Sequence, residues 1–408
     1  MTASTVPSPA PASPDPGPAP GLTAGTSTWR LRPQALRVVI GLELRQRVRS
    51  KRWYVALGLW FLFLMGMSLL ILASYLVLDL DGAGSLRGAG GLAFSLGTLL
   101  LVFLQLLVLP ALSAGAVNGD RTAGTLATLQ ATLLSPAEIV AGKVLASWIV
   151  GLAFLAAALP SIAPAALLSG ASPLYLLRIM VMLALLSLLV TMLGVGLSSL
   201  VRRPLGSVVL TYLVVIGAMV ILPVIWAASL PILSVDREST DYYQQPFDSD
   251  WMQVGTAPGH EATVVLPPGS PEPQPGDQVC VAETWETGGV RSEISAPLLW
   301  VNPFVLVADM APQIDPEELI AGSEPPLDLL RYLQLGMRWA SDPTSGSWSV
   351  HCDPGVPGYP EDLDTSLPGP IWPMGLAAWL LLGGASAATA VLRLRVPMRR
   401  IGSGTRIA

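Results

Sequence analysis

The stretch WYVALGLWFLFLMGMSLLILASYLVL, residues 53–78, runs for 26 residues without a single charged side chain. Crossing the hydrocarbon core of a bilayer takes roughly 20 helical residues. In lipid a helix can satisfy its own backbone polar groups, whereas an isolated strand cannot. We therefore predict a membrane-spanning helix here. Five further segments have the same apolar character, namely 91–117, 144–168, 174–201, 206–230 and 371–392.

Composition supports the same class of protein. Of the 408 residues, 52% are hydrophobic and only 12% are charged, whereas a soluble domain carries about 25% charged residues. The short alternating segments of a membrane β-barrel are not evident. We predict an all-α polytopic membrane protein with six transmembrane helices. A small α+β extracytoplasmic domain is expected between the fifth and the sixth, and residues 53–230 hold the first five.

Residues 231–370 have the opposite character, with 22 acidic residues, four arginines and both cysteines of the chain. Cysteines outside the cytoplasm are commonly oxidised, so Cys280 and Cys352 are expected to form a disulfide in an extracytoplasmic domain. Within it, 262–266 and 278–282 are predicted strands and 326–340 a helix.

The distribution of Lys and Arg orients the spans. Seventeen of them lie before the first span, after the second and fourth, and after the sixth, and the other ends carry only Arg87 and the four arginines of the insert. Basic residues mark the cytoplasmic side. This pattern predicts a multi-pass protein of the plasma (inner) membrane with both termini cytoplasmic. Residues 1–28 are then a disordered Pro-rich cytoplasmic tail, and 393–408 a basic one.

Residues 29–52 precede the first span and are strongly basic. Pro33 suits a first helical turn, and arginines fill much of the surface of the predicted helix. The pattern indicates a basic amphipathic helix at the inner membrane face, attracted to anionic membrane lipid. A plain positively charged stop before the span is the alternative. The apolar side chains at three- and four-residue spacing are Leu36, Val39, Ile40, Leu44 and Val48.

The loop NGDRTAGTLATLQATLLSPAEIVAGK, residues 118–143, is too polar to span a membrane. Leu126, Leu129, Leu133 and Leu134 make one apolar helical face. Ser135, Pro136 and Glu138 then form a helix start, with a serine cap, proline in the first turn and a capping-box glutamate. A short amphipathic helix on the cytoplasmic face would offer a surface to a partner protein.

This loop resembles the region between the second and third spans of type-2 ATP-binding-cassette (ABC) exporter permeases, and the likeness covers roughly 30–230 and 371–400. The basic stretch with Glu43, Arg45 and Arg49 resembles the interfacial connecting helix of that family. The matching loop residues are Asp120, Arg121, Gly124, Thr125, Leu126, Leu133, Leu134, Ser135, Pro136, Glu138, Ile139, Gly142 and Lys143.

Two features depart from the family pattern. An acidic residue often follows Gly-Thr-Leu in the family, whereas Ala127 stands here, and this difference is expected to alter a contact with the ATPase. The insert before the sixth span is also much longer than the short re-entrant helices usual there. Residues 300–307, with their Asn-Pro pair, are either a remnant of such a re-entrant segment or a core strand of the outer domain.

The resemblance implies a mechanism. A permease of this family has no nucleotide site, and a separate ABC ATPase subunit docks on the coupling loop and the connecting helix. ATP and Mg²⁺ are bound by that partner, and two permeases, identical or different, work as a pair. The interfacial helix would contribute Glu43, Arg45 and Arg49. The ATPase-coupling residues of the loop would be Asp120, Arg121, Gly124, Thr125, Leu126, Leu133, Ser135, Pro136, Glu138 and Lys143. The transported substrate is not readable from the sequence.

Catalytic and metal sites are not evident. No Gly-rich phosphate loop occurs, because Val144 follows Gly142-Lys143 where Ser or Thr would be required. His260 and His351 with the two cysteines lack the usual ligand spacing for a metal, and no calcium-loop pattern is present. The chain is therefore expected not to be an enzyme, to bind no cofactor or metal, and to have no nucleic-acid partner.

Two competing functions stay open. A secondary transporter would need charged or broken helices at mid-membrane and usually an internal repeat, and neither is evident. A membrane-anchored sensor or assembly protein would bind partners through its outer domain. Among polar residues in the spans, Gln105 either lines a substrate path or bonds a neighbouring helix, and Arg178 is expected to reach the interface. High Ala, Gly, Pro and Arg with little Lys is typical of a GC-rich bacterial source.

Overall fold

The computed structural model describes residues 28–78, 85–125, 134–201, 203–247, 260–264, 273–313, 328–341, 348–353, 355–360 and 369–395. Six of its helical segments are long and apolar enough to cross a membrane, as the sequence predicted. These segments are α2 (Lys51–Leu78), α3 (Leu86–Ser113) continued by α4 (Ala116–Thr122), α6 (Pro136–Ser169), α7 (Pro173–Leu200), α8 (Pro204–Ile216) continued through the π-helical turn η1 (Gly217–Ile221) into α9 (Leu222–Ser229), and α15 (Trp372–Arg393).

The three central spans are α3, α6 and α7. In their most apolar stretches 56%, 61% and 67% of residues are buried, against 11%, 22% and 28% for α2, α8–α9 and α15. The inner helices therefore form the core of the bundle, and the other three present most of their surface outward. Gln105 bonds the neighbouring helices, because its Nε2 donates to the carbonyl of Gly151 at 2.9 Å and to Ser187 Oγ at 3.2 Å. Arg178 is exposed near the start of α7.

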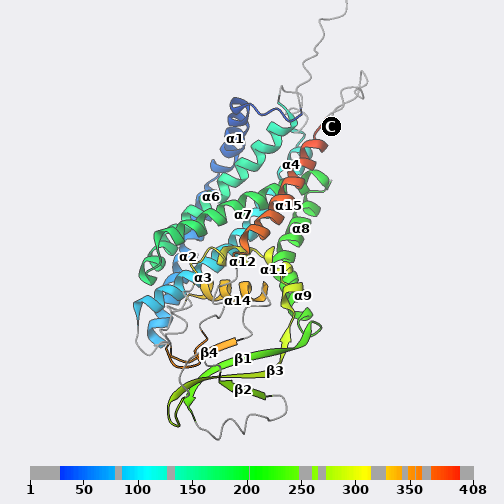
Figure 1. Ribbon diagram of the computed structural model, residues 1–408. Coiled ribbons are helices and arrows are strands. Elements are labelled where there is room, and N and C mark those ends of the chain that lie inside the picture. Colours follow the sequence, from blue (N-terminus) through cyan, green and yellow to red (C-terminus); the bar gives the residue numbers. More distant parts are fainter. Residues whose placement is uncertain are drawn as a thin grey trace, which may run out of the picture.

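Helix α1 (Pro33–Val48) lies beside α6 at the same end of the bundle as α4 (Figure 1). A turn at Arg49 and Ser50 separates it from α2, so the basic stretch predicted as a single element through residue 52 ends earlier. The last two residues of the predicted element, Lys51 and Arg52, already belong to the first span.

The opposite end of the bundle carries three short helices, which we call the distal layer: α11 (Pro297–Trp300), α12 (Pro303–Ala308) and α14 (Leu329–Ser341). The alternative of a core strand at 300–307 is wrong. Pro303 takes the first helical position, and the Asn302 side chain caps the helix by accepting from the amide of Phe304 at 2.8 Å. The helix predicted at 326–340 is confirmed as α14 from Leu329 onward.

The distal layer is fastened to the last two spans. The Asn302 amide donates to the carbonyl of Met219 in the π-helical turn at 3.1 Å, and Trp379 Nε1 donates to the carbonyl of Val301 at 2.8 Å. Gly375 lets α15 approach closely, since a Cβ there would lie 1.9 Å from the carbonyl oxygen of Trp300. Any larger residue at this position would push the distal layer off α15.

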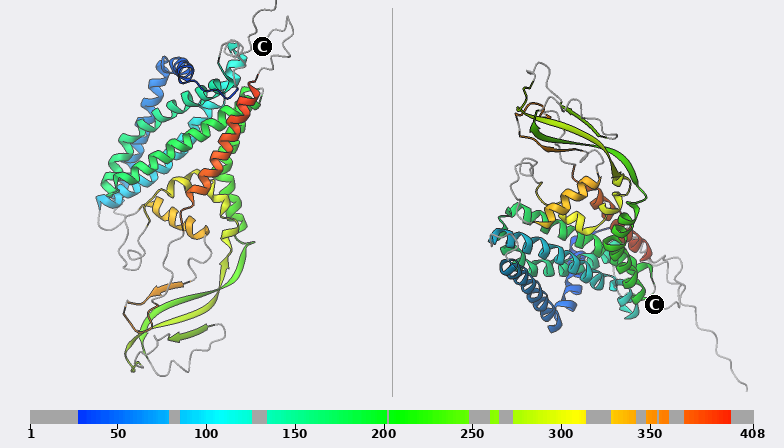
Figure 2. Two further views of the ribbon diagram at one scale, coloured as in Figure 1. Left: turned by 45° about the horizontal axis from the view of Figure 1, so that its top comes forward. Right: turned by 90° about the horizontal axis from the view of Figure 1, so that it is seen from below.

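Beyond the distal layer stands a sheet of four strands in the order β2-β3-β1-β4 (Figures 1 and 2). The two long strands β1 and β3 are antiparallel along their whole length, and β4 runs parallel to β1. The sequence predicted β2 and β3 but not β1 or β4. The strands are β1 (Ser234–Pro246), β2 (His260–Val264), β3 (Gln278–Val290) and β4 (Trp348–His351).

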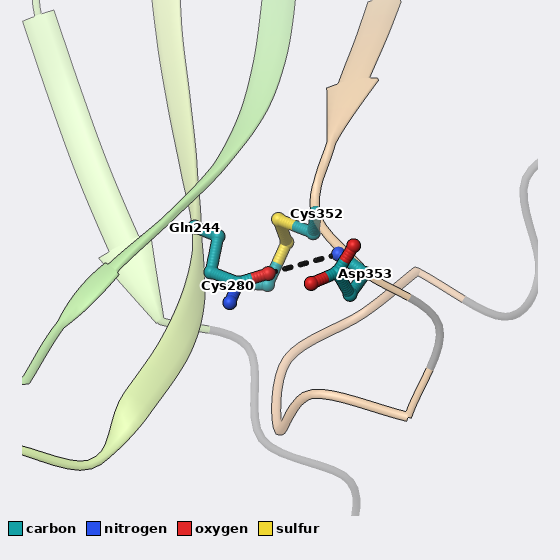
Figure 3. The surroundings of a disulfide bond; sticks show 4 residues. All are labelled: Gln244, Cys280, Cys352 and Asp353. Atoms are coloured by element: carbon teal, nitrogen blue, oxygen red, sulfur yellow. Dashed lines mark hydrogen bonds between the residues drawn. A yellow bond between two sulfur atoms is a disulfide. The ribbon is translucent and has the colours of Figure 1, made fainter. Parts of the chain in front are cut away.

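The predicted disulfide is present between Cys280 and Cys352, whose Cα atoms are 5.8 Å apart. Cys280 lies in β3 and Cys352 directly follows β4, so the bond ties two strands that β1 separates. Beside it the amide of Asp353 donates to Gln244 Oε1 of β1 at 2.9 Å (Figure 3). Disulfide and hydrogen bond together fix β4 at the edge of the sheet.

Candidate functional site

Three helices meet at a buried ion cluster formed by Lys143, Glu43 and Asp120, which we call the Lys143 triad. Lys143 Nζ of α6 lies 2.5 Å from Glu43 Oε1 of α1, and it also pairs with the Asp120 carboxylate of α4. The lysine side chain is only 1% exposed. A buried charge is costly unless it is paired, so the pairing holds the three helices together as one unit.

The sequence placed these residues in two separate predicted sets. Asp120 and Lys143 belong to the loop that matches the exporter permeases, whereas Glu43 belongs to the basic stretch before the first span. The structure brings all three to one point. Their roles in contacting an ATPase stay predictions, and the direct contacts of Glu43 and Lys143 are internal, because both side chains are buried.

The start of α6 is built as predicted. Ser135 accepts from the amide of Glu138 at 3.1 Å, and Glu138 Oε2 accepts from the amide of Ser135 at 2.9 Å, with Pro136 in the first turn. The capping box is thereby confirmed. The capping box uses one carboxylate oxygen of Glu138, whose side chain is fully buried. The other oxygen can therefore accept a hydrogen bond from a second partner.

That second partner is Arg32, immediately before α1. Its Nε donates to Glu138 Oε1 at 2.9 Å and its backbone amide donates to the same oxygen at 2.8 Å. The hydrogen bond that its guanidinium donates to Glu138 raises the pKa of Arg32 above its ordinary value. Ser135 Oγ also donates to the carbonyl of Arg30 at 2.5 Å. The chain entering α1 is therefore bound across the first turn of α6.

Gly142 sets the spacing between α1 and α6. A Cβ built at this position would lie 2.4 Å from Cγ1 of Val39, which is 4% exposed. Any side chain at residue 142 must push α1 away, and with it Glu43, which reaches Lys143 from the next turn. The close approach of the two helices thus depends on a residue without a Cβ.

Gly142→Ala is expected to lower the free energy of unfolding by roughly 1–3 kcal/mol, the usual cost of overpacking. Gly41→Ala is a matched control, because a Cβ at Gly41 meets nothing within 4 Å and alanine favours helix over glycine by roughly 1 kcal/mol. The measurement is thermal unfolding of each purified variant in detergent. Equal midpoints for the two alanine variants would contradict the close approach.

The most buried apolar side chains of α1 point toward the protein, and the position predicted for this helix at the inner membrane face stays a prediction. Val39 is buried against α6 and Leu44 packs against the central core, while Leu36, Ile40 and Val48 are half-buried. Helical periodicity identifies an apolar face without distinguishing a protein partner from lipid. The exposed side of α1 instead carries Arg45 and Arg49.

Asn118 is a site residue that the sequence reasoning missed. It is fully buried, and its Nδ2 donates to Ser207 Oγ of α8 at 3.2 Å while its backbone amide donates to Ser198 Oγ of α7 at 3.1 Å. Its Oδ1 accepts from Arg121 Nη1 at 3.2 Å. Asn118 thereby anchors α4 on two spans. The sequence signal for this residue was a polar amide side chain directly after the apolar run 91–117.

Residues 121–125, which we call the α4 tip, are exposed throughout. Gly124 has a φ of +72°, a left-handed conformation that favours glycine. Thr125 Oγ1 donates to the carbonyl of Asp120 at 3.3 Å and folds the tip back on its base. Two further predicted residues, Leu126 and Leu133, lie outside the described residues, as does most of the amphipathic helix expected at 126–134.

The arrangement is a projecting tip on a rigid base. The base consists of the Lys143 triad and Asn118, whereas Arg121, Gly124 and Thr125 face outward. Within the described residues no group of three or more His, Cys, Asp or Glu side chains could hold a metal ion. An exposed tip on a packed base is a surface that another macromolecule can contact.

Comparison with known families matches residues 37–314 to the family described as ABC-2 family transporter protein. The matched range contains most of α1, the Lys143 triad, the α4 tip, the first five spans and α12. No curated protein matches the chain.

Proposed function

The chain belongs to the ABC-2 transporter family, and from that premise we propose that it is a permease subunit that exports its substrate, driven by ATP hydrolysis on a separate ATPase subunit. The permease class and the multi-pass membrane character follow from the family and the six spans. The outward direction of transport, the ATPase and its docking place are our proposal.

The observation that carries the docking place is the exposed α4 tip on a buried ionic base. A force on the tip displaces Asp120, and Asp120 is paired with Lys143 of α6. Separating buried opposite charges is costly, so α6 and, through Glu43, α1 move with α4. The tip can thus transmit a push from outside the bundle to two helices at once.

The remaining parts of the proposal concern assembly and orientation. ATP and Mg²⁺ are bound by the ATPase, and a second permease, identical or different, completes the transporter. The α4 end lies on the cytoplasmic side of the inner membrane, and the sheet with its disulfide lies on the opposite side. Support comes from the concentration of Lys and Arg at the α4 end and from the oxidised cysteine pair at the other.

Arg121→Glu is expected to reduce the amount of ATPase that co-purifies with the permease by about 10-fold, because charge reversal at an interface rim weakens docking. The side chain is exposed and gives up one hydrogen bond, to Asn118 Oδ1, worth roughly 1 kcal/mol, so the thermal unfolding midpoint should fall only slightly. The measurement is Mg²⁺-dependent ATP hydrolysis per mole of permease after affinity purification from native membranes.

Arg291→Gln serves as the control, since Arg291 is 55% exposed at the base of the sheet. It should retain the ATPase activity of the unaltered protein. If no ATPase co-purifies with the native chain, or if Arg121→Glu retains it in full, docking on the α4 tip is wrong.

A further inference from the structure

Helices α1 and α2 both rest on one side of α6. Their polar contacts advance along α6 in step with the sequence, so α1 covers its first turns and α2 its later ones. The faces of α1 and α2 that point away from α6 therefore lie on the same side of the bundle. The contacts are Glu43 with Lys143 at 2.5 Å, Arg47 Nη2 to Ser147 Oγ at 3.1 Å, Trp60 Nε1 to the carbonyl of Phe154 at 3.0 Å, and Ser68 Oγ to the carbonyl of Ser161 at 3.2 Å.

A continuous stripe of exposed residues runs along the side of α1 that faces away from α6. Its members follow one another at three- or four-residue spacing and therefore share one helical face. Val38 is 68% exposed and Leu42 48% exposed. The stripe thus begins apolar and ends basic. Its residues are Gln34, Val38, Leu42, Arg45 and Arg49.

All charged residues of this stripe are basic. Glu43, the sole acidic residue of α1, is buried and neutralised by Lys143. Arg47 turns inward to Ser147, and burial lowers its pKa below the ordinary value. Arg45 and Arg49 are the charged members of the stripe. An anion approaching this face meets positive charge without any neighbouring carboxylate on α1.

The depth of the stripe indicates which anion it meets. Arg47 lies opposite Ser147, just inside the apolar span predicted from residue 144, so Arg45 and Arg49 lie where that span begins. The side of α2 that follows is exposed and apolar, with Leu59 62% and Leu62 63% exposed. Arginines at the edge of a lipid-facing surface lie at the level of phospholipid headgroups.

We propose that the stripe on α1, with Arg45 and Arg49 as its charged residues, binds the phosphate headgroups of anionic phospholipids in the leaflet at the α4 end. Val38 and Leu42 enter the boundary between headgroups and acyl chains. The bound lipid presses α1 against α6 and so supports the Lys143 triad. The α4 tip stays free for the ATPase, because the stripe lies on α1 and does not include residues 121–125.

The test measures the midpoint of thermal unfolding of the purified full-length protein while phosphatidylglycerol or phosphatidylcholine is titrated into the detergent. Phosphatidylglycerol should stabilise the native protein more than phosphatidylcholine does. In Arg45→Gln/Arg49→Gln the phosphatidylglycerol concentration for half-maximal stabilisation should rise roughly 25-fold, since each arginine contributes roughly 5-fold near an anionic surface.

The charge-matched control is Arg121→Gln/Arg291→Gln, which removes two exposed arginines away from the stripe. It should keep the full preference for phosphatidylglycerol. An equal response of the native protein to both lipids would overturn the proposal, as would an unaltered preference in the Arg45/Arg49 variant. A variant that keeps this preference and loses the ATPase would assign the stripe to the ATPase instead. Loss of ATPase in Arg121→Glu tests the docking proposal separately.

Discussion

Lys143→Met is expected to destabilise the protein by about 3–5 kcal/mol, the usual cost of removing one partner from a buried ion pair. Methionine keeps most of the volume of the lysine side chain and fills the same space between the helices. It leaves the carboxylates of Glu43 and Asp120 near each other without the lysine ammonium that pairs with both. Their repulsion should separate α1 from α4, so the unfolding midpoint falls by several degrees and ATP-driven transport is lost.

Lys51→Met is a matched control, because the chain has only two lysines and Lys51 is exposed at the start of α2. It removes the same charge with little effect on the unfolding midpoint. A second variant separates stability from coupling. Adding Glu43→Gln and Asp120→Asn to Lys143→Met removes the repulsion, so stability should largely return while transport stays impaired. A Lys143→Met protein as stable as Lys51→Met would show that the triad does not hold these helices.

The sequence predicted what local signals encode. Long uncharged stretches predicted the six spans, and Ser135 with Glu138 predicted the capping box, because residues close in the chain determine both. The Lys143 triad could not be predicted in this way. Glu43 and Lys143 are 100 residues apart, and no local pattern shows which faces of two distant helices meet. The glycine that permits the contact, Gly142, carries no such signal either.

The missed strand β1 has a different cause. Ser234–Pro246 contains acidic, amide and hydroxyl residues rather than an alternation of apolar and polar ones. None of the side chains described in this strand is fully buried, so neither face requires an apolar pattern. Pairing across thirteen residues of β3, rather than burial of one face, makes it a strand. Alternation is an informative signal only for strands that cover a core.

The distal layer has a buried ionic centre of its own at Asp309, whose side chain is fully buried. Its Oδ1 accepts from Arg338 Nε of α14 at 2.6 Å. Its Oδ2 accepts from the amides of Ile371 and Trp372 at 2.9 and 2.8 Å, where α15 begins. One carboxylate therefore joins α14 to the free amides of the sixth span. A negative charge at a helix N-terminus is further favoured by the helix dipole.

Asp309→Asn is expected to lower the free energy of unfolding by about 3–5 kcal/mol. Asparagine has nearly the same shape but only one acceptor oxygen, so either Arg338 or the α15 amides must face an NH₂ donor. Arg338, which is 5% exposed, loses the charge of its buried partner. The first turn of α15 should then open, and its amides should exchange with solvent much faster. Hydrogen exchange over residues 369–378, with thermal unfolding in detergent, measures both effects.

Asp236→Asn provides the comparison, because Asp236 is exposed on β1 and the substitution removes the same charge. Its exchange over 369–378 should match that of the native protein. The difference in exchange rate between Asp309→Asn and the native protein tests whether α15 is held by Asp309 or by packing alone. Packing through Gly375 and Trp379 persists in Asp309→Asn, so unchanged exchange at Ile371 and Trp372 would mean that packing suffices. Faster exchange confined to this turn, with α7 unaffected, would identify the carboxylate as the link between the distal layer and the sixth span.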